Sequence, residues 1–563
     1  MTQQLMIKAK TAAWYLTQSV NQLLYSTVFN NAVWAATNAT LVSGETDPVA
    51  GTDAFSVTAS AANATLLQTV VLSNGTINRT FSVYLKRKTG TGDISITVDG
   101  ITYVVKTTTG AWARFDTGLS IGGTITCGLK IATSADAVYV AFAQLEDGSA
   151  ATTYSAVTAS PYTVTQIVDG DYPSNTARGC VFLDGRFFVM SLAGEIYQSA
   201  LEDASSWSAL EFIQSQIDPS DGVFLTKSGN YVVAIKEWST EFFYDAANAT
   251  GSILSPVQNA AVQIGGAAEG SVQDLGGSII FMAQTRNGFG RSVMTISGQS
   301  LSKISTSSVE KILDRDDLAT VYSWSAQVGS HALYGVTLVT SGVTLVYDFS
   351  TQHWSFFTYL TTSGGALTVT AVTALGVVTV ATHGLSDGDI VKIASVNSDF
   401  NGWHVVTTVT TNTFQIQATG TVFSGSGTAQ KYIETYFPVV ASVRANGRQY
   451  MQDKSSGNLY EFTPEVTVDY VGAIAARLRT PKLDDGTTNY KTMGKAEVIG
   501  DKISSTAVLR WTDDDYATYA SFRPVDLSAP RSQIRRVGNY RRRAFELLHV
   551  KDALLRVTEL EVE

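Results

Sequence analysis

Six arginines gather within one short stretch of a chain that is acidic as a whole. The chain has 563 residues and a formal net charge of −10. Guanidinium groups bind carboxylates and phosphates through paired hydrogen bonds, so this stretch could line a channel or contact an acidic partner subunit. A partner is favoured over DNA, because a wall that held the polyanion tightly would stop it from sliding. Alternatively, these charges could only deter edge-to-edge aggregation of strands. The arginines are Arg531, Arg535, Arg536, Arg541, Arg542 and Arg543, and Lys551 follows them.

Four aromatic residues in the first third of the chain could bind carbohydrate. They are Trp34, Tyr84, Trp112 and Tyr139. Sugar rings stack on aromatic faces, and neighbouring polar side chains hold the sugar hydroxyls. Aromatic residues of a β-sandwich more often fill its core, so a glycan site on these four residues is a hypothesis that depends on their exposure.

Other chemistry-bearing residues lack the spacing that catalysis or metal binding requires. The histidines are scattered, with no HExxH motif, and no phosphate-binding GxxxxGK[ST] motif is present. The many carboxylates show no pattern that would pair two of them across a cleft, as a glycosidase needs. The acidic runs 513–515 and 484–485 lack the rest of a calcium-binding loop and are interpreted as solvated turns. We therefore expect no enzyme activity, no metal and no cofactor. The histidines are His331, His353, His383, His404 and His549.

The elements that position these residues should be β-strands. Charged residues make up 16% of the chain and hydrophobic residues 44%, with many small and β-branched residues, which favours several all-β domains. Cys127 and Cys180 could pair, but two buried thiols are the more common case. Lys8 and Lys10 interrupt the first apolar run, and no stretch of about 18 apolar residues occurs. We expect no signal peptide, no membrane span, and a soluble protein.

The residue pattern changes along the chain and predicts an order of domains. Residues 1–30 fit a helical and an extended spacing equally well. The next segment alternates as a β-sandwich, and Asp99-Gly100 within it predicts a hairpin turn. Short strands closed by turns then follow, as in the blades of a β-propeller. The expected domains are 1–30 (N-terminal segment), 31–158 (sandwich), 159–362 (first propeller segment), 363–431 (inserted small barrel), 432–465 (second propeller segment) and 466–563 (C-terminal β-rich domain).

Two of these segments resemble modules of phage proteins. FSVYLKR (81–87), the strand of Trp112 and AQLEDGSAATTYSAV (143–157) are similar to carbohydrate-binding-module-like jelly rolls. THGLSDGDIVKI (382–393), NSDFNGWHVV (397–406) and NTFQI (412–416) are similar to a small β-barrel inserted in many phage tail proteins. The expected fold class is therefore all-β, with a β-propeller-like core, an N-terminal jelly-roll sandwich and a small inserted β-barrel.

Five further motifs, in order, resemble the packaged-DNA stabilisation or tail nozzle (tail hub) proteins of short-tailed phages. The jelly roll and the 363–431 unit depart from the pattern of that family, so the number of blades and the closure of the ring stay open. The motifs are EWSTEFFYDAANATGS (237–252), VQIGGAAEGSVQDLGGSIIFMA (262–283), SGQSLSKISTSSVEKIL (297–313), TLVYDFSTQHWSFF (344–357) and RRVGNYRRRAFELLHVKDALLRVTELEVE (535–563).

This resemblance implies a structural protein of the virion tail, synthesised in the cytoplasm of the bacterial host. Copies would form a ring, a homo-hexamer in the family, around a channel below the portal and the tail adaptor protein. The ring would carry tail fibres or a needle. It would stabilise packaged DNA and conduct it during ejection without sequence-specific binding. Propeller faces supply rigid, loop-rich contact surfaces, and cyclic symmetry encloses a channel.

A second interpretation is a tail fibre or spike protein that binds a host glycan through the jelly roll. Spikes usually contain long β-helical or coiled-coil repeats for trimerisation, and this sequence has none. The jelly roll could equally serve as a surface decoration or as a docking face for a neighbouring tail protein. An enzyme such as a capsule depolymerase is the least favoured class.

Overall fold

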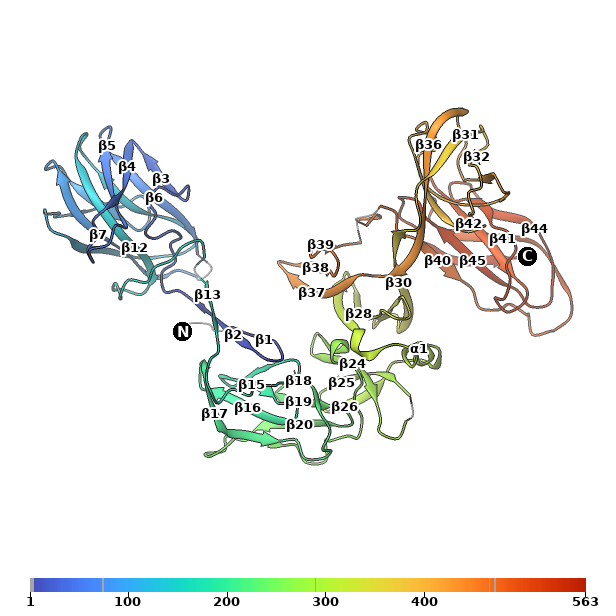
Figure 1. Ribbon diagram of the computed structural model, residues 1–563, viewed down its shortest axis with the longest axis horizontal. Coiled ribbons are helices and arrows are strands. Elements are labelled where there is room, and N and C mark those ends of the chain that lie inside the picture. Colours follow the sequence, from blue (N-terminus) through green and yellow to red (C-terminus); the bar gives the residue numbers. More distant parts are fainter. Residues whose placement is uncertain (1–4, 73–74, 161, 289, 465, 470–471) are drawn as a thin grey trace. The chain divides into compact units, whose positions relative to one another are not determined.

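The computed structural model describes residues 5–72, 75–160, 162–288, 290–464, 466–469 and 472–563. The chain divides into two compact units, Met1–Ser215 with Asp245–Ser255, and Gln216–Tyr244 with Pro256–Glu563. Strands form nearly all of the regular structure (Figure 1). The described residues contain one α-helix and the short 3-10 helices η1 (Glu269–Ser271) and η2 (Leu318–Thr320). The predicted all-β fold class is confirmed.

The first unit contains an N-terminal sandwich of two five-stranded antiparallel sheets. One sheet has the order β10 (Ala113–Ile121), β7 (Ile77–Thr89), β12 (Ala137–Asp147), β5 (Ala54–Ala59) and β4 (Ala39–Glu45). The other has the order β3 (Trp34–Thr37), β6 (Ala64–Val71), β11 (Thr124–Ile131), β8 (Ile94–Thr97) and β9 (Val104–Lys106). These two layers form the jelly-roll-like sandwich that the sequence predicts.

Period-2 alternation builds the core of this sandwich. Phe81, Val83 and Leu85 of β7 are buried and contact Ile94 and Ile96 of the opposite sheet in one apolar cluster. Each such side chain stabilises the fold by about 1.5–3 kcal/mol through burial. The residues between them on β7 face the other side of the sheet, because successive side chains of a strand point in opposite directions.

The turn predicted at Asp99-Gly100 is present but wider than a two-residue hairpin. Ile96 pairs with Val104, so residues 97–103 form the loop. Gly100 adopts φ +74°, which glycine tolerates without strain. The Asp99 Oδ1 atom accepts hydrogen bonds from the backbone N–H groups of Ile101 and Thr102. This side chain replaces the missing ladder bonds and stabilises the longer loop.

Two further sheets complete the first unit. Residues that fitted both a helical and an extended spacing form strands, β1 (Leu5–Lys8) and β2 (Ala13–Gln18), and β2 also pairs with β13 (Tyr162–Gln166). A four-stranded sheet follows, with a tight turn at Asp184-Gly185 in which both residues have positive φ. Met6, Phe187 and Trp207 belong to one apolar cluster that joins the two sheets. The four strands are β14 (Val181–Leu183), β15 (Arg186–Met190), β16 (Glu195–Ala200) and β17 (Asp203–Gln214).

The second unit contains successive antiparallel sheets, which we call blades. The first consists of β18 (Gly222–Ser228), β19 (Tyr231–Lys236) and β20 (Thr240–Asp245), and the boundary between the units passes through the next strand, β21 (Leu254–Pro256). The second consists of β22 (Gly265–Gly266), β23 (Gln273–Leu275), β24 (Ser278–Gln284), β25 (Ser292–Ser297) and β26 (Ser300–Lys303). The third consists of β27 (Tyr322–Val328), β28 (His331–Leu338), β29 (Val343–Asp348) and β30 (His353–Thr362). The fourth consists of β37 (Val439–Ala445), β38 (Arg448–Asp453) and β39 (Leu459–Phe462).

Successive blades pack face to face, as in a propeller. On β24, Ile279 and Phe281 face the cluster shared with β19 and β20, whereas Ile280 and Met282 face the cluster shared with β28 and β29. The third and fourth blades share another cluster, which contains Trp324 of β27. Because both faces of a middle blade are buried, its strands are apolar at successive positions and not only at alternate ones.

The one helix among the described residues, α1 (Ser307–Leu313), lies beside the second blade (Figure 1). Its N-cap is Thr306, whose hydroxyl accepts a hydrogen bond from the backbone of Val309 at 3.5 Å. Val309 and Leu313 are spaced by one turn and are buried in the cluster between the second and third blades. Within the motif SGQSLSKISTSSVEKIL (297–313), strand β26 is thus followed by helix α1.

The third blade continues into the insertion. β30 pairs with β36 (Phe423–Tyr436), and these two strands form a stalk whose far end belongs to a small barrel. The barrel has its own core, built around Phe400 and Phe414. The boundary that we predicted at residues 431/432 lies within β36. The remaining barrel strands are β31 (Leu367–Val372), β32 (Val377–Thr379), β33 (Ile390–Ala394), β34 (Gly402–Val405) and β35 (Thr413–Gln415).

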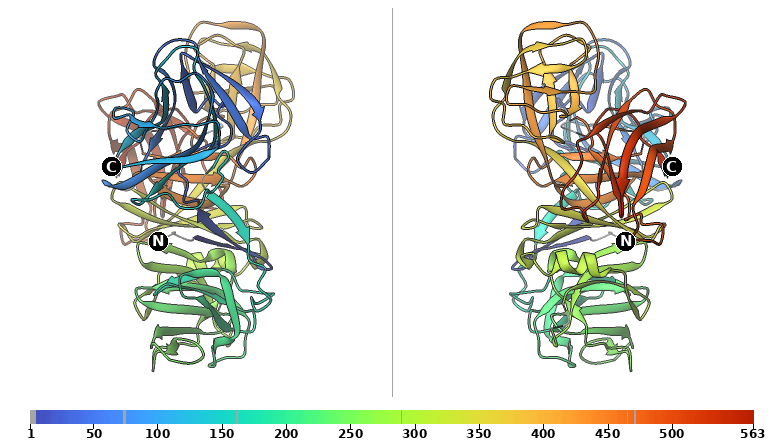
Figure 2. Two further views of the ribbon diagram at one scale, coloured as in Figure 1. Left: turned by 90° about the vertical axis from the view of Figure 1, so that its left-hand side faces the viewer. Right: turned by 90° about the vertical axis from the view of Figure 1, so that its right-hand side faces the viewer.

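A C-terminal sandwich completes the second unit. One sheet has the order β40 (Ala476–Arg479), β45 (Ala544–His549), β42 (Thr506–Thr512) and β43 (Arg523–Asp526). The other has the order β44 (Ser532–Tyr540), β41 (Lys491–Gly500) and β46 (Val557–Val562). The sandwich lies next to the barrel and its stalk (Figure 2, right), because Leu360, Trp403 and Leu548 share an apolar cluster.

Candidate functional site

The arginine-rich stretch runs along β44 and into the following loop. Ile534 and Val537 face the core of the C-terminal sandwich, whereas Arg531, Arg535 and Arg536 are exposed. A bulge lies at this point, since the pairing with β41 shifts register and Arg536 has φ +60°. A bulge re-aims side chains along a strand edge. Three of the predicted contact residues are therefore available to a partner.

The remaining arginines lie in the loop after β44, where Arg541 and Arg542 are exposed and Arg543 is buried. Arg541 lies over the ring of Tyr490, with the guanidinium carbon 4.5 Å from the ring centroid. Arg542 forms an ion pair with Asp515 at 3.0 Å, and both side chains are largely exposed. Such surface contacts contribute about 0–1 kcal/mol, so both guanidinium groups can exchange their present contacts for others.

Arg543 was predicted to contact a partner or a channel, and the structure corrects this. The residue is 2% exposed. Its Nε and Nη2 atoms donate to the two carboxylate oxygens of Asp513 at 2.8 and 2.7 Å. Its Nη1 atom donates to the backbone carbonyl of Val537 at 3.0 Å. All of these donors are used inside the sandwich, so Arg543 stabilises the fold and is not available to a partner.

The acidic run 513–515 has protein partners at each position. Asp513 holds Arg543, and Asp515 pairs with Lys482 at 2.8 Å. Asp514 accepts hydrogen bonds from the hydroxyl groups of Thr512 and Thr518, which lower its pKa to about 2. Among the residues that the structure describes, no group of three or more histidine, cysteine, aspartate or glutamate side chains could hold a metal ion.

A buried carboxylate that the sequence reasoning missed lies nearby. Glu546 of β45 is 0% exposed. Burial alone would raise its pKa, but the neighbouring guanidinium groups hold the pKa below its usual value. Arg477 and Arg510 pair with one of its oxygens at 2.8 and 2.6 Å, and Arg479 pairs with the other at 2.5 Å. The carboxylate thus joins two neighbouring strands of the sheet, β40 and β42, to β45.

The same cluster reaches the stalk of the insertion. Arg477 also pairs with Glu434 of β36 at 2.6 Å. The guanidinium of Arg510 lies 4.0 Å from the ring centroid of Tyr519 and 4.2 Å from that of Phe522. The ion pair of Arg477 and Glu434 joins the sandwich to the stalk, whereas the ring contacts of Arg510 lie within the sandwich.

Buried histidines lie in the same region. His404 Nδ1 accepts from the ammonium of Lys551 at 2.9 Å, and its Nε2 donates to the Phe400 carbonyl at 2.9 Å. Burial, and then the Lys551 charge, lower the pKa of His404 to about 3. His549 lies 2.8 Å from the Ser505 hydroxyl, and burial lowers its pKa to about 4. Both imidazoles are neutral at pH 7.

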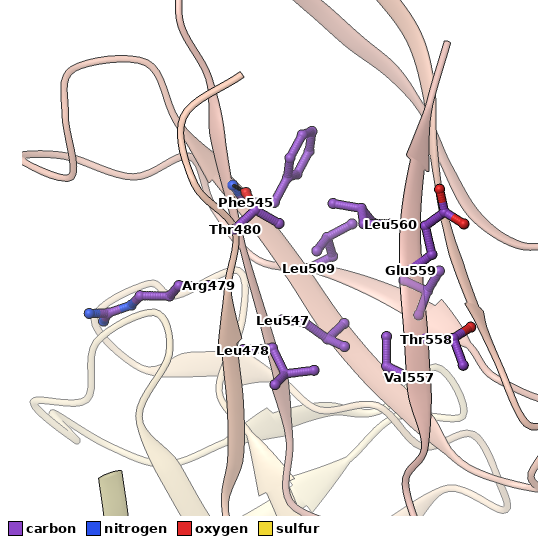
Figure 3. A pocket seen from close by; sticks show the side chains of 11 residues that line it. Leu478, Arg479, Thr480, Leu509, Phe545, Leu547, Val557, Thr558, Glu559 and Leu560 are labelled. Atoms are coloured by element: carbon purple, nitrogen blue, oxygen red, sulfur yellow. Dashed lines mark hydrogen bonds between the residues drawn. The ribbon is translucent and has the colours of Figure 1, made fainter. Parts of the chain in front are cut away.

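A cavity opens between the two sheets of the C-terminal sandwich, on the side of β40 and β46. Its volume is about 220 Å³. Leu509, Leu547 and Leu560 point into the space between the strands (Figure 3). Arg479 and Glu559 lie at its rim. The lining is mostly aliphatic.

One of the four predicted glycan-binding residues is buried in the core of the N-terminal sandwich, and the structure corrects this prediction. Trp34 is 5% exposed, and its ring lies 5.0 Å from that of Phe29. Its indole N–H donates to the Tyr25 carbonyl at 3.1 Å. A sugar could not stack on this ring without unfolding the sandwich.

The other three predicted residues lie together on the outer face of the sheet β10-β7-β12-β5-β4. Tyr84 and Tyr139 come from β7 and β12, and Trp112 directly precedes β10; all three are half-buried. The rings of Trp112 and Tyr139 are 6.3 Å apart. Tyr84 lies 5.9 Å from Phe142, which Tyr154 covers in a stacked contact. We call this surface the aromatic face, defined by Tyr84, Trp112 and Tyr139 with the cations Lys86, Lys88 and Arg114.

The remaining predictions concern cysteines and membrane spans. Cys127 and Cys180 are both free, and Cys127 is buried. Burial raises the pKa of the Cys127 thiol to about 12, which makes it unreactive. Within the stretches of chain that the structure describes, no helix is long and apolar enough to cross a membrane.

The sequence matches a family model described as "Bacteriophage P22 Gp10, beta-propeller" over residues 116–382. The matched range is a little under half of the chain and contains the first three blades of the second unit. The match supports a phage structural tail protein located in the virion. No curated protein matches the sequence.

Three solved structures illustrate the fold similarities. Tailspike protein 4 of bacteriophage CBA120 is 11% identical over 23% of this chain and 22% of that structure, with a TM-score of 0.20. This chain thus spans about a fifth of the tailspike structure. The CBM22-1 xylan-binding domain of Paenibacillus barcinonensis Xyn10C is 18% identical over 26% of this chain and 99% of that domain, with a TM-score of 0.19. BamB from Moraxella catarrhalis is 12% identical over 51% of this chain and 82% of that one, with a TM-score of 0.21.

Proposed function

We propose that this protein is a nozzle or hub subunit of the tail of a short-tailed phage. Copies form a ring-shaped channel below the portal and the adaptor protein, stabilise packaged DNA and conduct it during ejection. The observation that carries the proposal is the match to the Gp10 propeller family over residues 116–382, where the second unit has successive face-to-face blades. The hexameric state and the neighbouring tail proteins are proposed from the family resemblance alone.

The blades suit a mechanical role. Clusters of buried side chains join each blade to the next, so the region is rigid and presents turns and loops for contacts. Tyr334 adds a polar tie, since its hydroxyl donates to the Ser271 carbonyl of the preceding blade at 2.7 Å. Rigid subunits can close into a ring with cyclic symmetry and enclose a channel.

The exposed arginines on and after β44 would contact the next copy in the ring. With a net charge of −10, each copy offers an excess of carboxylates to its neighbour. Complementary charge sets the register of such a heterologous interface. An acidic chain also suits a channel for DNA, because a basic wall would hold the polyanion.

Electron microscopy of the purified full-length chain tests this proposal. A six-fold ring with a central hole is expected. A monomer at micromolar concentration, or a three-fold rod, contradicts it. Arg535→Glu with Arg536→Glu should reduce ring formation at least tenfold, measured by mass photometry. Arg448→Glu is the matched control, since Arg448 is also exposed, lies on β38 and pairs with the exposed Glu461.

A second candidate function is glycan recognition by the N-terminal sandwich, and the aromatic face favours it. Three aromatic side chains and several polar ones lie together on an outer sheet surface there. A phage tail protein could use both functions at once, since the ring contacts and the aromatic face involve different residues. Binding of a saccharide to the full-length chain, lost on substitution of the aromatic face, is the test.

A further inference from the structure

The aromatic face combines its rings with positive charge. Lys86 and Lys88 are two positions apart on β7, so both side chains emerge on the face of the sheet that carries Tyr84. Tyr139 of β12 is directly opposite Lys86 in the ladder. Arg114 of β10 is directly opposite Tyr84. Three adjacent strands therefore place cations and aromatic rings side by side.

Distances confirm that these groups contact one another. The Nζ atoms of Lys86 and Lys88 lie 5.5 and 5.0 Å from the ring centroid of Tyr139. The guanidinium carbon of Arg114 lies 5.8 Å from the centroid of Tyr84. Cation–π contacts of this kind hold a charge close to an apolar surface without neutralising it.

Most of this positive charge has no carboxylate partner. Lys88 pairs with Glu45 at 3.2 Å and also donates to the Ser56 hydroxyl at 2.9 Å. Among the described residues, neither Lys86 nor Arg114 forms an ion pair within 4.0 Å; Arg114 donates to Ser82 and to a backbone carbonyl instead. Lys86 and Arg114, which have no ion-pair partner among the described residues, thus lie beside aromatic rings.

Two other carboxylates lie near this face, and neither forms an ion pair with Lys86 or Lys88 among the described residues. Glu146 is buried on β12 and accepts hydrogen bonds from Gln144 and from the hydroxyl of Thr152. Asp116 lies on β10, the edge strand, and is exposed. Glu146 is linked through Thr152 to Arg114, whereas Lys86 and Lys88 both lie at Tyr139, so the positive charge of the face is concentrated around Tyr139.

We propose that the aromatic face binds a saccharide that carries carboxylate groups. Sugar rings pack on Trp112 and Tyr139, the carboxylate pairs with Lys86, and Arg114 and Lys88 flank it. Three half-buried aromatic rings on one sheet surface favour a sugar, whose ring stacks on aromatic faces, over an acidic peptide, for which charge alone would suffice. This inference rests on the second candidate function and names its ligand class.

The test is the affinity of the full-length chain for two acidic probes, a galacturonic acid hexamer and a sialic acid hexamer. Each is compared with the same oligosaccharide after reduction of its carboxyl groups to hydroxymethyl groups. At least one acidic probe should bind tenfold or more tightly than its reduced form, and 0.5 M NaCl should weaken this binding. Lys86→Met should reduce the affinity at least tenfold, because it keeps the side-chain volume and removes the charge.

The chain offers a matched control for this substitution. Lys130 lies over the ring of Tyr103, with its Nζ atom 4.2 Å from the centroid, but it belongs to the opposite sheet. Lys130→Met should change the affinity less than twofold. An equal loss in both variants would overturn the proposal. Unchanged tryptophan fluorescence shows that each variant is folded.

The remaining outcomes distinguish a failure of the acidic ligand class from a failure of glycan recognition itself. Equal binding of acidic and reduced oligosaccharides overturns the acidic class but leaves glycan recognition standing. Absence of binding to all four probes overturns both. Poly-glutamate binding as tight as the acidic sugars would overturn the saccharide and indicate an acidic protein partner. Ring formation, measured by mass photometry on the same samples, reports separately on the nozzle proposal.

Discussion

The N-terminal and C-terminal sandwiches share an architecture but place their charged side chains differently. In the N-terminal sandwich the two sheets enclose a large apolar cluster, the buried Arg79 pairs with Asp147 at 3.1 Å, and further cations lie on an outer sheet face. In the C-terminal sandwich a fully buried glutamate, Glu546, holds three arginines. Charged side chains near the surface stay available to a ligand, whereas buried ones pair with each other and hold neighbouring strands together.

This difference follows from what each sandwich must contact. The C-terminal sandwich packs on the stalk of the insertion through Leu360 and Leu548, and Glu434 of the stalk joins the buried ion cluster. Apolar contacts alone permit several registers between two surfaces, while paired charges permit few. We infer that the ion cluster specifies one orientation of stalk and sandwich, as a rigid tail component requires.

Of the changes that test this difference between the sandwiches, removal of the buried Glu546 carboxylate should have the largest effect. Glu546→Gln should destabilise the C-terminal sandwich by about 3–5 kcal/mol, because Arg479 and Arg510 lose their carboxylate partner at a buried site and Arg477 keeps only Glu434. Hydrogen exchange of the peptides that contain β40 and β45 measures this loss. Glu561→Gln, an exposed change on β46, should stay within about 0.5 kcal/mol. A parallel loss of protection in the N-terminal sandwich would contradict the local role of the cluster.

Arg542 and Arg543 also allow exposed and buried charge to be compared, because Arg542 is exposed and its neighbour Arg543 is buried. Arg543→Lys should cost about 2–3 kcal/mol, since a lysine cannot replace the paired bonds to Asp513 and the bond to the Val537 carbonyl. Arg542→Lys is the control and should be nearly neutral, because Arg542 forms one exposed ion pair. Urea denaturation followed by tryptophan fluorescence reports the change, as Trp511 lies beside Arg543. Equal midpoints for the two variants would show that Arg543 is not structural.

The fold class could be predicted from the sequence, because strand alternation and turn residues are local signals. The hairpin at Asp184-Gly185 is an example: the turn residues and the flanking apolar residues are contiguous in the chain. The blades follow for the same reason. The Asp99-Gly100 turn was identified, but its width depends on the pairing of Ile96 with Val104, which the turn residues do not determine.

Whether a candidate site residue is buried or exposed could not be predicted, because contacts with distant parts of the chain decide it. Arg542 and Arg543 are adjacent, and only the pairing of Arg543 with Leu483 and Asp513, from distant stretches of the chain, directs it inward. The sequence does not show that Trp34 is buried, because Phe29 is close to it in the chain but the core behind both residues, which includes Phe55, comes from distant strands. Glu546 sits in an apolar strand, and its arginine partners come from two other strands. Alternation indicates which residues share a face but not which face is covered.

Lowering the pH should destabilise the C-terminal sandwich, and the barrel that packs on it, more than the N-terminal sandwich. The pKa of His404 is lowered to about 3 and that of His549 to about 4, so the native state binds fewer protons than the unfolded state between these values and about pH 6.5. Stability contributed by the neutral imidazoles is present above about pH 6.5 and is lost as the pH falls. Residues 31–158 contain no histidine.

We therefore expect the barrel around His404 and the C-terminal sandwich around His549 each to lose about 1–2 kcal/mol between pH 7 and pH 5. The N-terminal sandwich should change little over the same range. Hydrogen exchange at both pH values, corrected for the intrinsic exchange rate, compares the two in one sample. His404→Gln should remove some of the difference. Equal pH dependence in both sandwiches would contradict the role of the histidines.

The smallest effect is expected from a valine-to-isoleucine substitution, which compares how tightly the interiors of the two sandwiches are packed. Val498 of β41 lines the cavity of about 220 Å³ between the sheets of the C-terminal sandwich. Val498→Ile adds a methylene group that the cavity can accept, so it should stabilise this sandwich by about 0.8 kcal/mol. Val57 of β5 is fully buried in the apolar cluster of the N-terminal sandwich. There Val57→Ile should overpack the core and cost about 1–3 kcal/mol. Local hydrogen exchange measures both changes, and a stabilising effect at Val57 would mean that the N-terminal interior is as loosely packed as the C-terminal one.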